Sequence, residues 1–77
     1  MTPAQKKLAR HALGLDEPMA RGRSYRNRYF TGAPHDDWQA MVAAGLAKVS
    51  CSYTLTPAGA KAALDKSETL DPEDFPA

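Results

Sequence analysis

The densest group of side chains suited to chemistry lies in residues 21–30, which read RGRSYRNRYF. Guanidinium groups pair bidentately with phosphates and stack on bases, and aromatic rings offer stacking platforms for unpaired bases. An asparagine amide can also hydrogen-bond a base edge. The segment therefore predicts contact with nucleic acid or with another anionic partner. The residues assigned to this contact are Arg21, Arg23, Tyr25, Arg26, Asn27 and Arg28.

Two other interpretations of the same segment stay open. Its arginines could bind an acidic protein surface. They could equally form a solvated face, while Tyr25, Tyr29 and Phe30 enter a core that is short of large apolar residues. Three cations near the N-terminus could extend the contact surface, although they also fit the polar side of an ordinary amphipathic helix. These are Lys6, Lys7 and Arg10.

Charge is distributed unevenly along the chain. Residues 1–30 hold seven basic and two acidic side chains, whereas residues 64–77 hold one lysine and five acidic side chains. Such asymmetry is typical of a basic contact surface combined with an acidic tail. We expect residues 67–77 to be a disordered acidic tail. The tail could fold over the basic residues, or it could mimic nucleic acid with Leu70 and Phe75 as apolar anchors.

Catalytic and metal-binding chemistry finds little support in the sequence. His11 and the run His35-Asp36-Asp37 lack the spacing that converges on one ion. Cys51 is the only cysteine, and no orienting group or nucleophile motif accompanies it or Ser24. We therefore expect a protein that is not an enzyme, with no catalytic residues, no metal site, no cofactor and no small-molecule substrate.

Three helices and a short β-hairpin are predicted to position these residues. Thr2-Pro3 and Thr56-Pro57 each combine a capping side chain with a proline suited to the first helical position. An acidic first turn marks the helix that begins at His35. The expected helices cover residues 3–14, 35–45 and 57–66, and the expected strands cover residues 46–50 and 53–56. The predicted class is α+β, with one domain over residues 1–66.

Residues 16–34 are expected to form a long basic loop between the first two helices, punctuated by glycine and proline. A loop of this length is uncommon in a compact domain and is often functional. An extended portion would alternate the directions of its side chains: Tyr25, Asn27 and Tyr29 to one side, Arg26, Arg28 and Phe30 to the other. Trp38 belongs to an apolar stripe expected in the core, and it could also serve as an interface anchor.

The segment from Trp38 to Leu64, WQAMVAAGLAKVSCSYTLTPAGAKAAL, resembles the second half of a winged-helix domain of the MarR or PadR type. The matching residues are Gly45-Leu46, at the end of a helix, and Leu55-Thr56-Pro57-Ala58-Gly59, where a wing strand runs into the next helix. The resemblance implies a small winged-helix-like domain in which the helix before Gly45 lies in the major groove. This chain departs from the pattern, because that helix starts with two aspartates and has no basic residue before Lys48.

A second resemblance covers more of the chain. The order QxxLxxHALGL, GRxYRNRYFTG, W, GL and LTPAG is similar to small uncharacterised proteins of bacteriophages and prophages. It implies a phage-type protein in the cytoplasm of a bacterial host cell. Two functions follow as hypotheses: an accessory or regulatory contact with nucleic acid or a nucleoprotein complex, or an anti-CRISPR-like inhibition of a host defence system or host enzyme through protein–protein contact. No apolar run is long enough for a signal peptide or a membrane span, and a homodimer would let so short a chain bury more surface.

Overall fold

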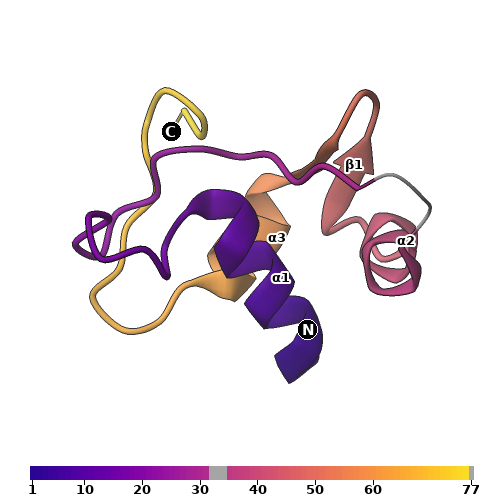
Figure 1. Cartoon of the computed structure of the whole chain (residues 1–77), viewed down its shortest axis with the longest axis horizontal. Coiled ribbons are helices and arrows are strands. Elements are labelled where there is room, and N and C mark those ends of the chain that lie inside the picture. Colours follow the sequence, from indigo (N-terminus) through magenta and orange to yellow (C-terminus); the bar gives the residue numbers. More distant parts are fainter. Residues whose placement is uncertain (32–34, 77) are drawn as a thin grey trace.

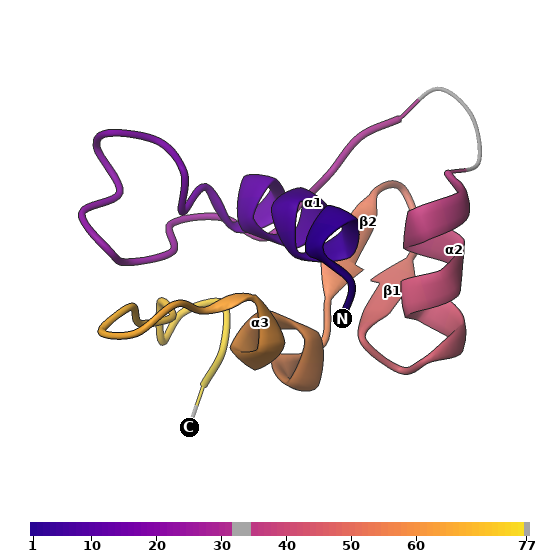
Figure 2. The same ribbon diagram turned by 90° about the horizontal axis from the view of Figure 1, so that it is seen from below.

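The computed structural model describes residues 1–31 and 35–76, which form three helices and one two-stranded antiparallel sheet. The elements are α1 (Pro3–Leu13), α2 (Asp36–Ala43), β1 (Ala47–Val49), β2 (Tyr53–Leu55) and α3 (Pro57–Ala63) (Figure 1). Helix α1 packs against α3, and α2 packs against β1 (Figure 2). The expected α+β class, with three helices and a short hairpin, is confirmed. None of the helices in the described part of the chain has the length and apolar character needed to cross a membrane.

Helix α1 begins and ends where its capping residues predict. The Thr2 hydroxyl accepts a hydrogen bond from the Gln5 amide at 3.1 Å, and the Gln5 side chain accepts one from the Thr2 amide at 3.0 Å. This reciprocal pair is a capping box. Gly14 ends the helix with a φ of 76°, and its amide donates to the carbonyls of the preceding turn. A left-handed residue at this position favours glycine.

The two motifs that carry the winged-helix resemblance are in direct contact. The Thr56 hydroxyl caps α3 by accepting from the Gly59 amide at 3.2 Å, and it donates to the Gly45 carbonyl at 2.7 Å. The Thr56 amide donates to the Leu46 carbonyl at 3.1 Å. A Cβ at Gly59 would collide with that same carbonyl. The close approach of α3 to the turn between α2 and β1 therefore requires glycine at position 59.

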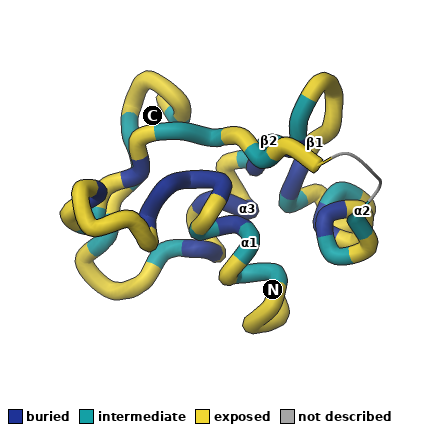
Figure 3. The backbone as a smooth tube through the Cα atoms, in the orientation of Figure 1, coloured by how far each residue is buried: buried dark blue, intermediate teal, exposed yellow. Residues whose placement is uncertain are grey.

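The core lies between α1, α2, α3 and the hairpin, and the buried segments in Figure 3 meet there. Trp38 is fully buried. Its ring lies 5.3 Å from the rings of both Tyr29 and Tyr53. A side chain with no exposed surface cannot anchor an interface, so this part of the prediction for Trp38 is wrong and the core interpretation holds.

The buried face of α1 consists of Ala9, Ala12 and Leu13, whereas Ala4 near its start is exposed. Helix α3 ends earlier than expected, at Ala63 rather than near Lys66, because Leu64 already has extended backbone angles. The acidic segment that follows can then turn toward the loop.

The loop between α1 and α2 is partly ordered by pairing with other segments. After a series of turns, Tyr29 exchanges two backbone hydrogen bonds of 2.9 Å with Tyr53 of β2. Arg23 forms a parallel bridge with Thr69. The loop thus passes beside β2 at Tyr29, through an isolated bridge outside the two-stranded sheet (Figure 1). Residues 32–34 of the expected loop lie outside the described residues.

The acidic segment that was expected to be a disordered tail runs beside the loop in the structure. The Thr69 amide donates to the Gly22 carbonyl at 2.8 Å, and the Asp71 amide donates to the buried Ser24 hydroxyl at 2.8 Å. Leu70 and Phe75 are partly buried against the core, so they are not free apolar anchors. The expected disorder itself stays a prediction.

Candidate nucleic-acid interface

Helix α1 divides the basic residues near the N-terminus between two sides of the molecule. Lys6 and Arg10 face α3 and the acidic segment that follows it, where their charges meet carboxylates. Lys7 and His11 line the opposite region, beside the loop. The cations on the two sides of α1 therefore have different electrostatic surroundings.

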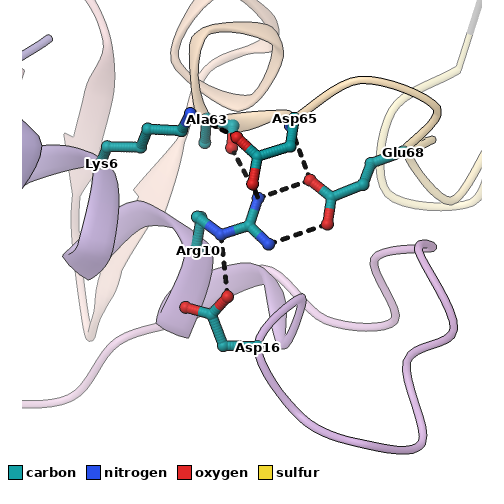
Figure 4. Close-up of polar contacts among 6 residues, drawn as sticks. All are labelled: Lys6, Arg10, Asp16, Ala63, Asp65 and Glu68. Carbon is teal, nitrogen blue, oxygen red and sulfur yellow. Dashed lines mark hydrogen bonds and ion pairs between the residues drawn. The ribbon is translucent and has the colours of Figure 1, made fainter.

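Arg10 lies at the centre of a group of ion pairs that we call the acidic clasp (Figure 4). The clasp consists of two basic and three acidic residues: Lys6, Arg10, Asp16, Asp65 and Glu68. The Arg10 Nε donates to Asp16 at 2.8 Å, Nη2 donates to Glu68 at 2.8 Å, and Nη1 donates to both Glu68 and the Ala63 carbonyl, the latter at 3.1 Å. Only 12% of the Arg10 side chain is exposed. The guanidinium therefore has its main hydrogen-bonding directions satisfied inside the protein.

The clasp also shifts the pKa values of Arg10 and Glu68. The hydrogen bonds that Arg10 donates to Glu68 raise the pKa of Arg10 above its usual value. The same bonds lower the pKa of Glu68 from 4.5 to about 2. Both groups are thus charged over the whole neutral range. Lys6 is partly exposed and pairs with Asp65. Lys6 and Arg10 therefore help to hold the chain together, and their predicted part in a contact surface stays a prediction.

Asn27 is also committed to the fold. Its side-chain amide nitrogen donates to the Leu55 carbonyl at 3.1 Å, and its side-chain oxygen accepts from the Leu55 amide at 2.8 Å. These bonds satisfy the outer edge of β2 in the way a neighbouring strand would. The Asn27 side chain is therefore engaged in the fold, and its predicted contact with a base edge stays a prediction.

Arg26 fastens the loop to the end of α1. Its Nη2 donates to the His11 carbonyl at 2.8 Å, and its Nη1 lies 3.1 Å from both the Glu17 carboxylate and the Tyr25 hydroxyl. The guanidinium also lies over the Tyr25 ring, 5.3 Å from its centroid. A hydrogen bond with Glu17 raises the pKa of Tyr25, so that phenol is neutral at physiological pH. Both terminal nitrogens of Arg26 therefore have partners within the protein, which leaves this guanidinium less available to a ligand.

The remaining loop arginines are more open. Arg23 is largely exposed and lies 3.7 Å from Asp71. Arg21 is exposed in a turn with a φ of 53°. Arg28 is exposed, and only its backbone amide is engaged, by the Ala12 carbonyl at 3.1 Å. Among the residues that the structure describes, the side chains of Arg21, Arg28 and Lys7 form no hydrogen bond or ion pair.

Arg28 lines a hollow of about 300 Å³ with four other side chains, His11, Arg26, Tyr29 and Phe30. A second hollow of about 450 Å³ shares His11 and Tyr29 with the first and reaches Lys7, His35 and Asp37. The two hollows therefore adjoin each other at His11 and Tyr29, and we treat them as one surface region. We call it the α1–loop groove.

The centre of the groove is built from aromatic side chains. The Tyr29 ring meets the His11 ring edge-on at 5.6 Å and the His35 ring edge-on at 6.3 Å. Tyr29 is partly buried, whereas Phe30 is 69% exposed. The expected alternation along the extended segment therefore holds here: Tyr29 contacts the core, and Phe30 points outward beside Arg28.

Sequence reasoning missed His11 and His35 as groove residues. Each was considered only as a metal ligand or catalytic group, and no group of three or more His, Cys, Asp or Glu side chains within residues 1–31 and 35–76 is arranged to hold a metal ion. The spacing of Lys7 and His11, four residues apart on one helix, was the available signal, because such residues share a helix face.

No protein-family model matches the chain, and neither a curated protein nor a solved structure matches it. Its function is therefore argued from the residues of the groove.

Proposed function

We propose that this chain is a non-enzymatic binding module that contacts nucleic acid through the α1–loop groove, as an accessory or regulatory protein of phage type. One observation carries the proposal. Arg28, a cation with no internal partner among the described residues, and Phe30, an exposed aromatic ring, line the same hollow. Nucleic acid offers a phosphate for the first and a base for the second.

The charge distribution around the groove supports this choice of partner. The chain has nine acidic side chains, and those nearest α1 pair with Lys6 and Arg10 in the acidic clasp. Arg28 and Lys7 are left at the groove, where Asp37 is the one acidic lining residue among those the structure describes. An unpaired cation in a concave site attracts an anionic ligand most strongly at low salt.

A second candidate function is inhibition of a host defence complex or host enzyme by protein–protein contact. The supporting observation is Met19, which is 89% exposed at the rim of a separate hollow of about 390 Å³. Tyr25, half-exposed, lines the same hollow. Exposed methionine and tyrosine side chains are enriched at protein interfaces.

A fluorescence-anisotropy titration tests the first function. Labelled oligonucleotides of roughly 12 residues suit this test, because sites on small single-strand-binding modules cover about 4–16 nucleotides. We expect binding that weakens as salt rises from about 50 to 200 mM, since each neutralised phosphate releases a counterion. Arg28→Ala should weaken binding roughly tenfold and reduce the salt slope by about one.

The matched control is Lys48→Ala. It removes the same charge from an exposed position on β1 that does not line the groove, so it should leave affinity nearly unchanged. Absence of binding by the unmodified chain at low salt would overturn the proposed function. Co-purification of one defined host protein, lost on Met19→Ser, would then support the second candidate.

A further inference from the structure

Phe30 is presented on a fixed piece of backbone. Its neighbour Tyr29 is anchored to Tyr53 by two hydrogen bonds of 2.9 Å, and the Tyr29 ring packs against the buried Trp38. The Phe30 ring itself is 69% exposed. A stacking platform whose backbone is already ordered costs little conformational entropy on binding.

Arg28 faces the same side as Phe30. The two residues are separated by one position in an extended segment, so their side chains point in the same direction about 7 Å apart along the chain. Both line the first hollow. The Arg28 amide donates to the Ala12 carbonyl at 3.1 Å, so the backbone that carries the Arg28 side chain is also held in place.

Helix α2 and the hairpin, the elements that bind duplex DNA in a winged helix, have few basic residues in this chain. Helix α2 carries no basic residue, and it begins with Asp36 and Asp37, which would be repelled by phosphates. The strands of the hairpin are three residues long and supply one cation, Lys48. In a duplex, moreover, the faces of the bases are stacked on each other, so an exposed protein ring has nothing to stack on without disrupting the helix.

We infer that the α1–loop groove takes single-stranded nucleic acid, with an unpaired base stacked on Phe30 and a phosphate paired with Arg28. This inference rests on the proposed function and narrows it to one class of nucleic acid. Lys7, at the other end of the groove, meets the phosphate backbone as it passes His11 and Tyr29. The shared chemistry is a flexible phosphodiester chain with unpaired bases, which both RNA and DNA single strands possess.

The test uses the full chain and four labelled ligands of equal length: a mixed-sequence RNA strand, the same sequence as a DNA strand, the corresponding DNA duplex, and an abasic DNA strand with the same phosphates. Both base-containing strands should bind at least roughly tenfold more tightly than the abasic strand, because stacking supplies affinity that phosphates do not. The duplex should bind more weakly than either single strand. Comparison of the RNA and DNA strands shows which of the two is the better ligand.

Two substitutions at Phe30 separate stacking from charge. Phe30→Leu keeps an apolar side chain but removes the ring, and it should weaken single-strand binding roughly tenfold with an unchanged salt slope. Phe30→Trp should retain binding and show an added fluorescence change on stacking. Equal affinity for duplex and single strand, or an unaltered affinity in Phe30→Leu, would overturn the inference while leaving the proposed function intact. No binding to any of the four ligands would overturn both.

Discussion

The acidic clasp and the α1–loop groove both include basic residues of α1, but these residues pair with carboxylates in the clasp and have no such partners at the groove among the described residues. Lys6 and Arg10 lie four residues apart and meet carboxylates of the C-terminal segment. Lys7 and His11 also lie four residues apart, one position further on, and face the groove. Residues i and i+4 share a helix face, whereas a step of one residue turns the side chain by about 100°. A shift of one residue along the helix therefore separates Lys6 and Arg10, which pair with carboxylates, from Lys7, which faces the groove.

This difference teaches that the number of basic residues in a segment says little about the strength of a basic surface. The N-terminal 30 residues hold seven cations, yet Arg10 and Lys6 have internal partners and Arg26 is partly engaged. The candidate interface depends on the cations that the acidic segment does not reach.

The largest expected effect is on the stability of the clasp. Arg10→Ala removes hydrogen bonds to two carboxylates and one carbonyl, and it leaves Glu68 with less compensation for its desolvation. We expect a loss of roughly 2 kcal/mol in the free energy of unfolding, measured by urea denaturation. Lys7→Ala, on the other side of the same helix, should change that free energy by less than about 0.5 kcal/mol. Equal losses of stability in Arg10→Ala and Lys7→Ala would contradict the distinction between the clasp and the groove.

Acid should weaken the clasp through Glu68. The pKa of Glu68 falls from 4.5 to about 2 on folding, so the folded state favours the charged carboxylate. Its contribution to stability is complete above pH 4.5 and is lost as the pH falls from there toward 2. We expect the amide protons of Thr69 and Asp71 to lose protection against hydrogen exchange over this window, measured by NMR as the exchange rate relative to that of an unstructured peptide at the same pH. In Glu68→Gln the protection of these amides should lose most of this dependence, and an unchanged dependence would assign it to other carboxylates.

A smaller effect distinguishes the two faces of the loop. Asn27→Ala removes both hydrogen bonds to Leu55 and leaves part of the β2 edge unsatisfied, so we expect a loss of about 1–2 kcal/mol in the free energy of unfolding. Phe30→Ala removes an exposed ring and should cost less than about 0.5 kcal/mol. Thermal unfolding of both variants checks the order, and a larger loss for Phe30→Ala would mean that its ring supports the fold rather than a ligand.

Local signals made most of the fold predictable. Thr2, Gly14 and Thr56 mark helix boundaries through bonds that form within four residues, so the sequence alone identifies them. The alternation of Tyr29 and Phe30 also follows from extended backbone geometry and needs no knowledge of distant residues.

The rest depended on contacts between residues far apart in the chain. Arg10 meets Glu68 across 58 positions, and Asn27 meets Leu55 across 28. No local pattern reveals such pairs, which explains why Arg10 and Asn27 were assigned to a binding surface. Lys7 and Arg28 were assigned to the same surface by the same reasoning, and in the structure it is the lack of an internal partner among the described residues that distinguishes them.

The separation of Arg10 and Glu68 also bears on how the chain comes to be folded. Closing a segment of 58 positions carries an entropic cost that increases slowly with length, and contacts of high sequence separation slow folding. The hairpin and the α2–β1 contact involve neighbouring segments and can form during synthesis, at about 5–20 residues per second. Arg10, by contrast, has to wait until residue 68 has left the ribosome. Until then the nascent chain exposes a more basic surface than the folded protein.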